Sequence, residues 1–124
     1  MDCCIDIEID CPASAGREET PKARVIHRCG ECKRQIMPGE HYHLDTLLND
    51  GKWDRYKQCR ECREIAEVLF CGTWHYGEVW YDLRDYVVEF MTLPWDAVAK
   101  MSPAAREKVL ALVEENWNEE ENNQ

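Results

Sequence analysis

Four cysteines in this chain of 124 residues form two C-x2-C pairs, Cys29 with Cys32 and Cys59 with Cys62. Two such pairs supply the four thiolates of a tetrahedral zinc site. Because four protein ligands leave no coordination position open for a substrate, we expect this zinc to be structural rather than catalytic. The chain also begins with acidic residues instead of the lysines and apolar run of an export signal. This predicts a reducing compartment, where cysteines hold metal more often than they form disulfides.

The other cysteines of the chain lie outside these pairs, and their spacing matches no metal-binding template. His75 follows the last of them by four residues, so a second zinc site built from these side chains is an alternative. We instead expect the remaining cysteines to be buried small apolar side chains or incidental thiols. The sequence thus predicts one structural Zn²⁺ and no second one. The residues left over are Cys3, Cys4, Cys11, Cys71 and His75.

The segment between the two pairs carries the turn and strand signals that would position the ligands. Gly30 suits a tight turn of the zinc-knuckle type inside the first pair. Asn49-Asp50-Gly51 favours a hairpin reversal between strands over residues 40–47 and 52–58. We expect the returning strand to place its aromatic residues opposite the apolar residues of the first strand. The expected partners are Trp53 and Tyr56 on one side, and Tyr42 and Leu44 on the other.

The second pair opens a helical pattern, because Ile65, Val68 and Leu69 recur at helical spacing. A helix N-terminus suits thiolates, since its unpaired N–H groups and dipole favour negative charge. Knuckle, hairpin and helix in this order predict a treble-clef zinc finger.

Apolar periodicity also predicts elements before this block. Ile5, Ile7 and Ile9 alternate with acidic residues, which indicates a strand over residues 3–10. Residues 12–23 have the small, charged and proline-rich composition of a linker or loop.

Two helices are predicted after the block. An amphipathic pattern covers roughly residues 78–91, and Ser102-Pro103 supplies an N-cap and a first-position proline for a last helix. The acidic end, residues 114–124, is expected to fray. The predicted fold is α+β, with an N-terminal strand, a treble-clef module and two or three C-terminal helices. The predicted divisions are 1–21 (strand and linker), 22–70 (zinc module), 71–117 (helical extension) and 118–124 (acidic tail).

Charge limits the classes of partner. The net charge is −10, divided as −5 over residues 1–21, +4 over 22–63 and −9 over 64–124. Such a chain repels polyphosphate as a whole, which counts against general nucleic-acid binding. The cations near the ligands could bind phosphate, but we favour compensation of the charge on zinc with four thiolates. They are Arg28, Lys33, Arg34, Lys57, Arg60 and Arg63.

Histidines near the hairpin raise a third alternative, a metal-dependent nuclease of the HNH type. His41 and His43 lie on the first hairpin strand, and His27 precedes the first cysteine pair. The pattern lacks a second histidine pair in the helix, so we expect no catalytic residues.

No apolar stretch approaches the ~18 residues of a membrane span.

The block from His27 to Cys62, with the segment Tyr76-Gly77-Glu78, resembles small zinc-finger proteins encoded by tailed phages and prophages. The motifs that carry the resemblance are His27-Arg28-Cys29-Gly30-Glu31-Cys32, Pro38-Gly39-Glu40, Gly51-Lys52-Trp53-Asp54 and Lys57-Gln58-Cys59-Arg60-Glu61-Cys62. The resemblance implies a treble-clef zinc protein made in the bacterial host cytoplasm. It assigns no mechanism.

The leading functional prediction is a non-enzymatic phage accessory protein that binds a host protein, such as a defence or transcription factor. The alternative is a nucleic-acid-binding regulator that uses the cations of residues 22–63. The candidate protein-binding surface combines the acidic helices with five aromatic residues, for which core packing is an equal alternative. These residues are Trp74, Tyr76, Trp80, Tyr81 and Trp95.

Overall fold

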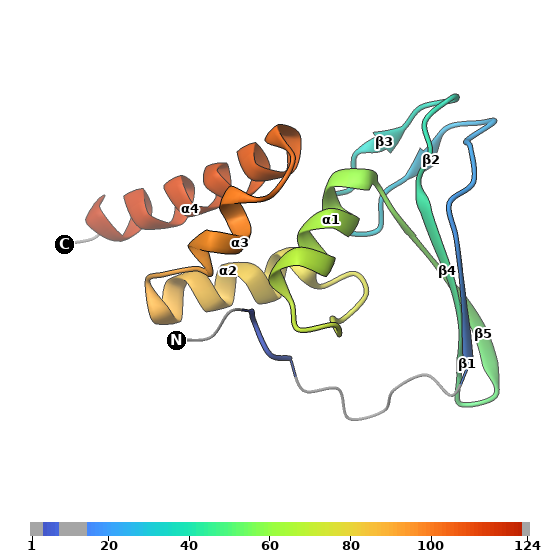
Figure 1. Cartoon of the computed structure of the whole chain (residues 1–124), viewed down its shortest axis with the longest axis horizontal. Coiled ribbons are helices and arrows are strands. Elements are labelled where there is room, and N and C mark those ends of the chain that lie inside the picture. Colours follow the sequence, from blue (N-terminus) through green and yellow to red (C-terminus); the bar gives the residue numbers. More distant parts are fainter. Residues whose placement is uncertain (1–3, 8–14, 123–124) are drawn as a thin grey trace.

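The computed structural model describes residues 4–7 and 15–122, and it shows a mixed α+β fold. A three-stranded antiparallel sheet with the order β1-β4-β5 lies on one side of the molecule and the helices lie on the other (Figure 1). A separate two-stranded sheet, β2-β3, carries the first cysteine pair in its turn. The elements are β1 (Ala15–Glu19), β2 (His27–Arg28), β3 (Gln35–Ile36), β4 (His43–Asn49), β5 (Lys52–Gln58), α1 (Arg60–Leu69), α2 (Val79–Phe90), α3 (Trp95–Ala99) and α4 (Pro103–Asn122).

The predicted hairpin between the cysteine pairs is confirmed. Asp50 and Gly51 have φ values of 54° and 76°, the two positive values that a tight two-residue hairpin turn needs. The predicted register is wrong, however, because a turn at these two residues fixes which residues face each other. Trp53 therefore lies opposite Leu48, and Tyr56 lies opposite Asp45. The predicted partners, Tyr42 and Leu44, instead belong to the buried cluster around the cysteines.

The N-terminal prediction is wrong in the part that the structure describes. Strand β1 (Ala15–Glu19) lies in the segment expected to be a linker, and it pairs antiparallel with β4 along its whole length. Every residue of β1 is exposed, so backbone hydrogen bonding to the edge of β4 forms this strand rather than apolar alternation. Within the predicted strand over residues 3–10, Ile5 makes an isolated parallel bridge to Phe70. Residues 8–10 lie outside the described part.

The predicted helices after the zinc block are confirmed. α2 spans Val79–Phe90, and α4 begins at Pro103 directly after Ser102. α4 continues to Asn122, so residues 118–122, expected to form a tail, are helical. None of the helices in the described part of the chain is long and apolar enough to cross a bilayer.

Buried apolar side chains form two separate clusters. The larger cluster joins Ile5 to residues of all four described helices, including Leu69, Leu83 and Val109. The smaller cluster surrounds the cysteines and includes residues from the strands and turns beside them. Trp80 of α2 packs against both, so it connects the helical core to the cysteine cluster.

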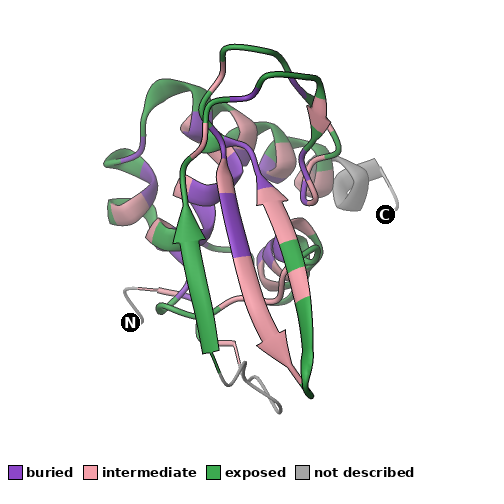
Figure 2. Cartoon of the chain, turned by 90° about the vertical axis from the view of Figure 1, so that its right-hand side faces the viewer, coloured by how far each residue is buried: buried purple, intermediate pink, exposed green. Residues whose placement is uncertain are grey.

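Arg63 of α1 connects the three-stranded sheet to the helices through a buried polar network. Its side chain is 3 % exposed and donates to Asp45 of β4 at 2.6 Å and to Glu18 of β1 at 2.8 Å. Tyr76 also donates to Asp45, and the Arg63 guanidinium lies 5.0 Å from the centre of the Trp74 ring. Figure 2 shows the burial of the three-stranded sheet, in which a buried stretch of β4 lies beside the exposed strand β1.

Contacts within this network favour the charged form of Arg63. Burial opposes the charge of Arg63, but hydrogen bonds to Glu67 and Asp45 outweigh it and raise the pKa of the guanidinium above its usual value. Burial and the hydrogen bond to Asp45 likewise raise the pKa of Tyr76. Arg63 is therefore a buried cation whose partners are carboxylates rather than the thiolates.

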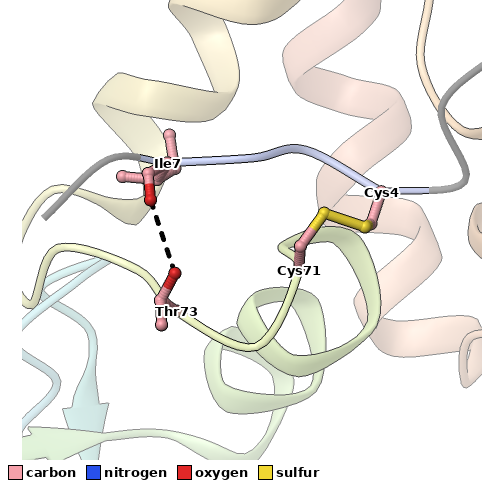
Figure 3. The surroundings of a disulfide bond; sticks show 4 residues. All are labelled: Cys4, Ile7, Cys71 and Thr73. Carbon is pink, nitrogen blue, oxygen red and sulfur yellow. Dashed lines mark hydrogen bonds between the residues drawn. A yellow bond between two sulfur atoms is a disulfide. The ribbon is translucent and has the colours of Figure 1, made fainter.

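A disulfide between Cys4 and Cys71 fixes the N-terminal segment to the end of α1 (Figure 3). Backbone hydrogen bonds from Ile5 N to Leu69 O (2.6 Å) and from Cys71 N to Ile5 O (2.9 Å) hold the two cysteines side by side. The expectation that these two cysteines are thiols is wrong, because the Ile5 bridge brings together residues 67 positions apart. Cys3 and Cys11 lie outside the described residues.

Replacing Arg63 by Met is expected to lower the free energy of unfolding by about 3–5 kcal/mol, because Asp45 then keeps a buried charge without a cation. Urea unfolding of the metal-loaded protein measures this loss. The matched control is Arg17→Met, whose 71 % exposed side chain pairs with Glu19 on the surface. This control should lose no more than about 1 kcal/mol. Equal losses in the two variants would contradict the buried role of Arg63.

Removing the disulfide with the double variant Cys4→Ser/Cys71→Ser is expected to lower the free energy of unfolding by about 2–4 kcal/mol, because the unfolded chain loses a cross-link that closes a long loop. The same urea experiment measures the effect. A mild reductant should lower the free energy of unfolding of the wild-type protein by the same amount as the double substitution. It should leave the stability of the double variant unchanged. Sensitivity of the double variant to reductant would instead place the effect at the other cysteines.

Candidate metal centre

The four paired cysteines converge as predicted. The sulfur atoms of Cys29, Cys32, Cys59 and Cys62 all lie within 4.8 Å of one another, and all but Cys32 are fully buried. Zinc–sulfur bonds of 2.3 Å in a tetrahedron place the sulfurs about 3.8 Å apart. The distance of 3.9 Å between Cys32 Sγ and Cys59 Sγ matches this value. The donor set therefore fits one tetrahedral zinc ion.

The turn that holds the first pair is closed by its own backbone. Cys29 N donates to Arg34 O at 2.9 Å, and Lys33, with a φ of 67°, donates its N–H to Cys29 O at 3.1 Å. Gly30 N donates to Lys57 O at 2.7 Å, and a Cβ at residue 30 would lie 3.1 Å from the same oxygen. Glycine is therefore favoured here by the close approach of β5, and the left-handed residue of the turn is Lys33.

The second pair stands at the start of α1, as the helical pattern predicts. Cys59 is the N-cap residue, and Cys62 lies in the first turn. Cys59 N donates to Cys29 Sγ at 3.3 Å, and Glu31 N donates to the same sulfur at 3.4 Å. Backbone N–H groups from both pairs thus stabilise negative charge on Cys29.

Two donors from distant elements complete the surroundings of the sulfurs. Trp80 Nε1 of α2 donates to Cys62 Sγ at 3.3 Å, and Lys108 Nζ of α4 lies 3.8 Å from Cys32 Sγ. Sequence reasoning missed both, because no local pattern links them to cysteines that lie 18 and 76 residues away. Both contacts fix C-terminal helices to the cysteine cluster.

Three of the cations expected to compensate the thiolates have other side-chain partners. Arg34 forms ion pairs with Glu40 at 3.0 Å and Glu61 at 3.1 Å, and these contacts raise its pKa. Lys57 Nζ donates to His27 Nδ1 at 3.1 Å. Among the predicted cations, Arg34 and Arg63 are thus neutralised by carboxylates.

Protons and metal compete for the four sulfurs. Hydrogen bonds from Cys32, Cys59 and Cys62 lower the pKa of Cys29, and sharing a proton with Cys29 raises the pKa of Cys59 and Cys62. A divalent cation would replace these shared protons, and all four groups would then bind as thiolates. Metal binding should therefore release protons and weaken as the pH falls.

Glu31, between the first two ligands, connects the metal centre to α2. This carboxylate is 8 % exposed and accepts hydrogen bonds from Gln58 Nε2 (2.9 Å), Gly77 N (2.8 Å) and Val79 N (3.1 Å). Val79 is the first residue of α2, whose own N-cap makes no side-chain hydrogen bond. A carboxylate from the metal-binding turn thus accepts a hydrogen bond from a free N–H group at the N-terminus of a helix nearly 50 residues away. Its negative charge also interacts favourably with the positive end of the helix dipole.

The histidines near the hairpin form no metal-binding group in the described part of the chain. His41 Nδ1 lies 3.3 Å from Thr20 O, while His43 is half-buried and its pKa is lowered by burial and by Arg63. His75, considered for a second site with the cysteines outside the two C-x2-C pairs, instead lies against Glu78 and Asp82. Cys71 is in the disulfide.

Comparison with known proteins gives little further information. No family model matches the chain, and no solved structure matches it. The chain is similar to Serendipity locus protein H-1 of Drosophila melanogaster, with 24 % identity over 87 residues. The match covers 67 % of this chain and 10 % of that protein, so the chain spans about a tenth of its relative.

We expect the purified protein to bind one Co²⁺ at the paired cysteines with intense sulfur-to-metal absorption, because four thiolates surround one ion. Cys59→Ser should weaken this absorption, whereas the control Cys4→Ser/Cys71→Ser should leave it unchanged.

Structural zinc contributes on the order of 10–16 kcal/mol, comparable with the whole stability of a domain, so chelation should unfold the chain. An unchanged circular-dichroism spectrum after complete metal removal would contradict this dependence.

Proposed function

We propose that this chain is a non-enzymatic phage or prophage accessory protein, in which a treble-clef zinc module supports an acidic helical half that binds a host protein. The order knuckle, hairpin and helix supports the treble clef. The phage origin is supported by the sequence resemblance. A structural role for the metal is supported by the four cysteine donors, which complete a tetrahedron by themselves.

The observation that carries this proposal is an exposed apolar stripe on α2. Tyr81 and Val88 are 61 % and 41 % exposed and lie seven residues apart, which places them on one face of the helix. Met91, which is 48 % exposed, is the C-cap residue directly after it. The opposite face is buried in the core through Val79, Leu83 and Val87. Large apolar side chains grouped on a surface are typical of protein-binding sites.

The aromatic residues considered for this surface divide into two groups. Trp74 and Trp80 pack against the helical core, and Tyr76 stacks on Tyr56 with ring centres 4.6 Å apart. Tyr81 and Trp95 are exposed, at 61 % and 42 %. We therefore limit the proposed surface to the α2 stripe together with Trp95.

A nucleic-acid-binding regulator is the second candidate, and one feature favours it. Exposed Arg60 lines a pocket of about 310 Å³ with Thr20, His41, Tyr42 and His43. The Arg60 guanidinium beside two histidines could bind a phosphate group of a nucleic-acid backbone. We rank this candidate second because Arg34 and Arg63 are neutralised by ion pairs and the chain carries a net charge of −10.

The experiment is capture of partners by the tagged, metal-loaded protein from bacterial lysate, with and without nuclease treatment. We expect a discrete protein partner that survives nuclease and is lost with Tyr81→Ala/Val88→Ala. Truncating a tyrosine that is a binding hot spot costs about 2 kcal/mol or more, so affinity for the purified partner should fall roughly thirtyfold or more.

The matched control is Leu110→Ala, which removes an exposed apolar side chain from α4 without touching α2. It should leave the affinity unchanged. Partners that disappear after nuclease treatment, or binding that depends on Arg60 instead of Tyr81, would contradict this proposal and favour the regulator.

A further inference from the structure

A second group of metal-binding side chains lies at the start of α2, outside the cysteine cluster. The ligand atoms of His75, Glu78 and Asp82 all lie within 4.8 Å of one another. His75 Nδ1 is 3.0 Å from Asp82 Oδ2 and 3.8 Å from Glu78 Oε2. One imidazole and two carboxylates therefore converge on a single point.

The backbone holds these three residues in place. Glu78 N donates to His75 O at 3.0 Å, and Asp82 N donates to Glu78 O at 2.9 Å. The same segment is fixed from its other side, since Glu31 accepts hydrogen bonds from Gly77 N and Val79 N. The ligands thus belong to a stretch of chain that is already attached to the cysteine cluster, which lowers the cost of ordering them around an ion.

Charge and accessibility both suit a cation. Two carboxylates face one imidazole, so the group carries a net negative charge whether His75 is neutral or protonated. The side chains of His75, Glu78 and Asp82 are 36 %, 61 % and 15 % exposed, which leaves an ion a path from solvent. Mixed imidazole and carboxylate donors favour divalent transition ions such as Zn²⁺, Co²⁺ or Ni²⁺.

We propose that His75, Glu78 and Asp82 form a second divalent-cation site, distinct from the cysteine centre. The three ligands found in the described part of the chain leave at least one position of a tetrahedral ion for a further ligand, such as water or a group from another molecule. The site is therefore exchangeable, whereas the four-cysteine site is closed. This inference does not depend on the proposed protein-binding function.

The test is a Co²⁺ titration of protein that already holds one zinc at its cysteines, followed by calorimetry and absorption spectroscopy. We expect one further equivalent of Co²⁺ to bind with weak visible absorption and without the intense sulfur-to-cobalt bands. Those bands would show replacement of the first zinc instead of binding at a second site. His75→Ala should weaken this second binding by at least about tenfold, because losing even an outer-shell partner of a metal ligand typically costs about 10–100-fold in affinity.

Asp82→Asn keeps the shape of the side chain and removes one anionic ligand, so it tests the site without truncating the helix. Asp85→Asn is the matched control, because it removes the same charge from an exposed position of α2 outside the cluster. Circular dichroism verifies that each variant is folded. Failure of the zinc-loaded wild type to bind Co²⁺, or equal loss of affinity in Asp82→Asn and Asp85→Asn, would overturn the proposal.

Discussion

Convergence of four cysteine sulfurs, those of Cys29, Cys59 and Cys62 fully buried, is the constraint on which the rest of this structure depends. Buried thiolates without a cation would repel one another, so a bound ion would stabilise the meeting of the turn after β2 with the start of α1. The helices then contact the same centre, α2 through Trp80 and α4 through Lys108. The metal centre is thus the point where segments from most of the described chain are joined.

Polar contacts, together with the Trp80 ring that packs against both apolar clusters, connect the two halves of the molecule. The buried residues of the helical core and of the cysteine cluster form two separate groups. The three-stranded sheet contacts the helices through the ion pair between Asp45 of β4 and Arg63 of α1. Glu31 has a similar role between the metal-binding turn and α2. Such buried charged groups add less net stability than apolar packing, but they tolerate few alternative arrangements because each unpaired charge is costly.

Four cysteine ligands would fill a tetrahedral site by themselves, which would leave function to the surfaces attached to it. The exposed stripe of α2 and the group formed by His75, Glu78 and Asp82 belong to one helix and the residues just before it. Both are fixed relative to the cysteines by Glu31 and Trp80. Binding at this helix would therefore depend on an ion held by the cysteines.

Local patterns in the sequence determined the four ligands, the hairpin turn and the starts of α1 and α4, because each depends on residues a few positions apart. The C-x2-C spacing indicates the ligands, Asp50-Gly51 indicates the hairpin turn, and Ser102-Pro103 indicates the start of α4. Tertiary structure alone decided the strand β1, the Cys4–Cys71 disulfide and the partners of Arg63. These features join residues far apart in the chain, and their energies arise only when packing has already brought the groups within bonding distance.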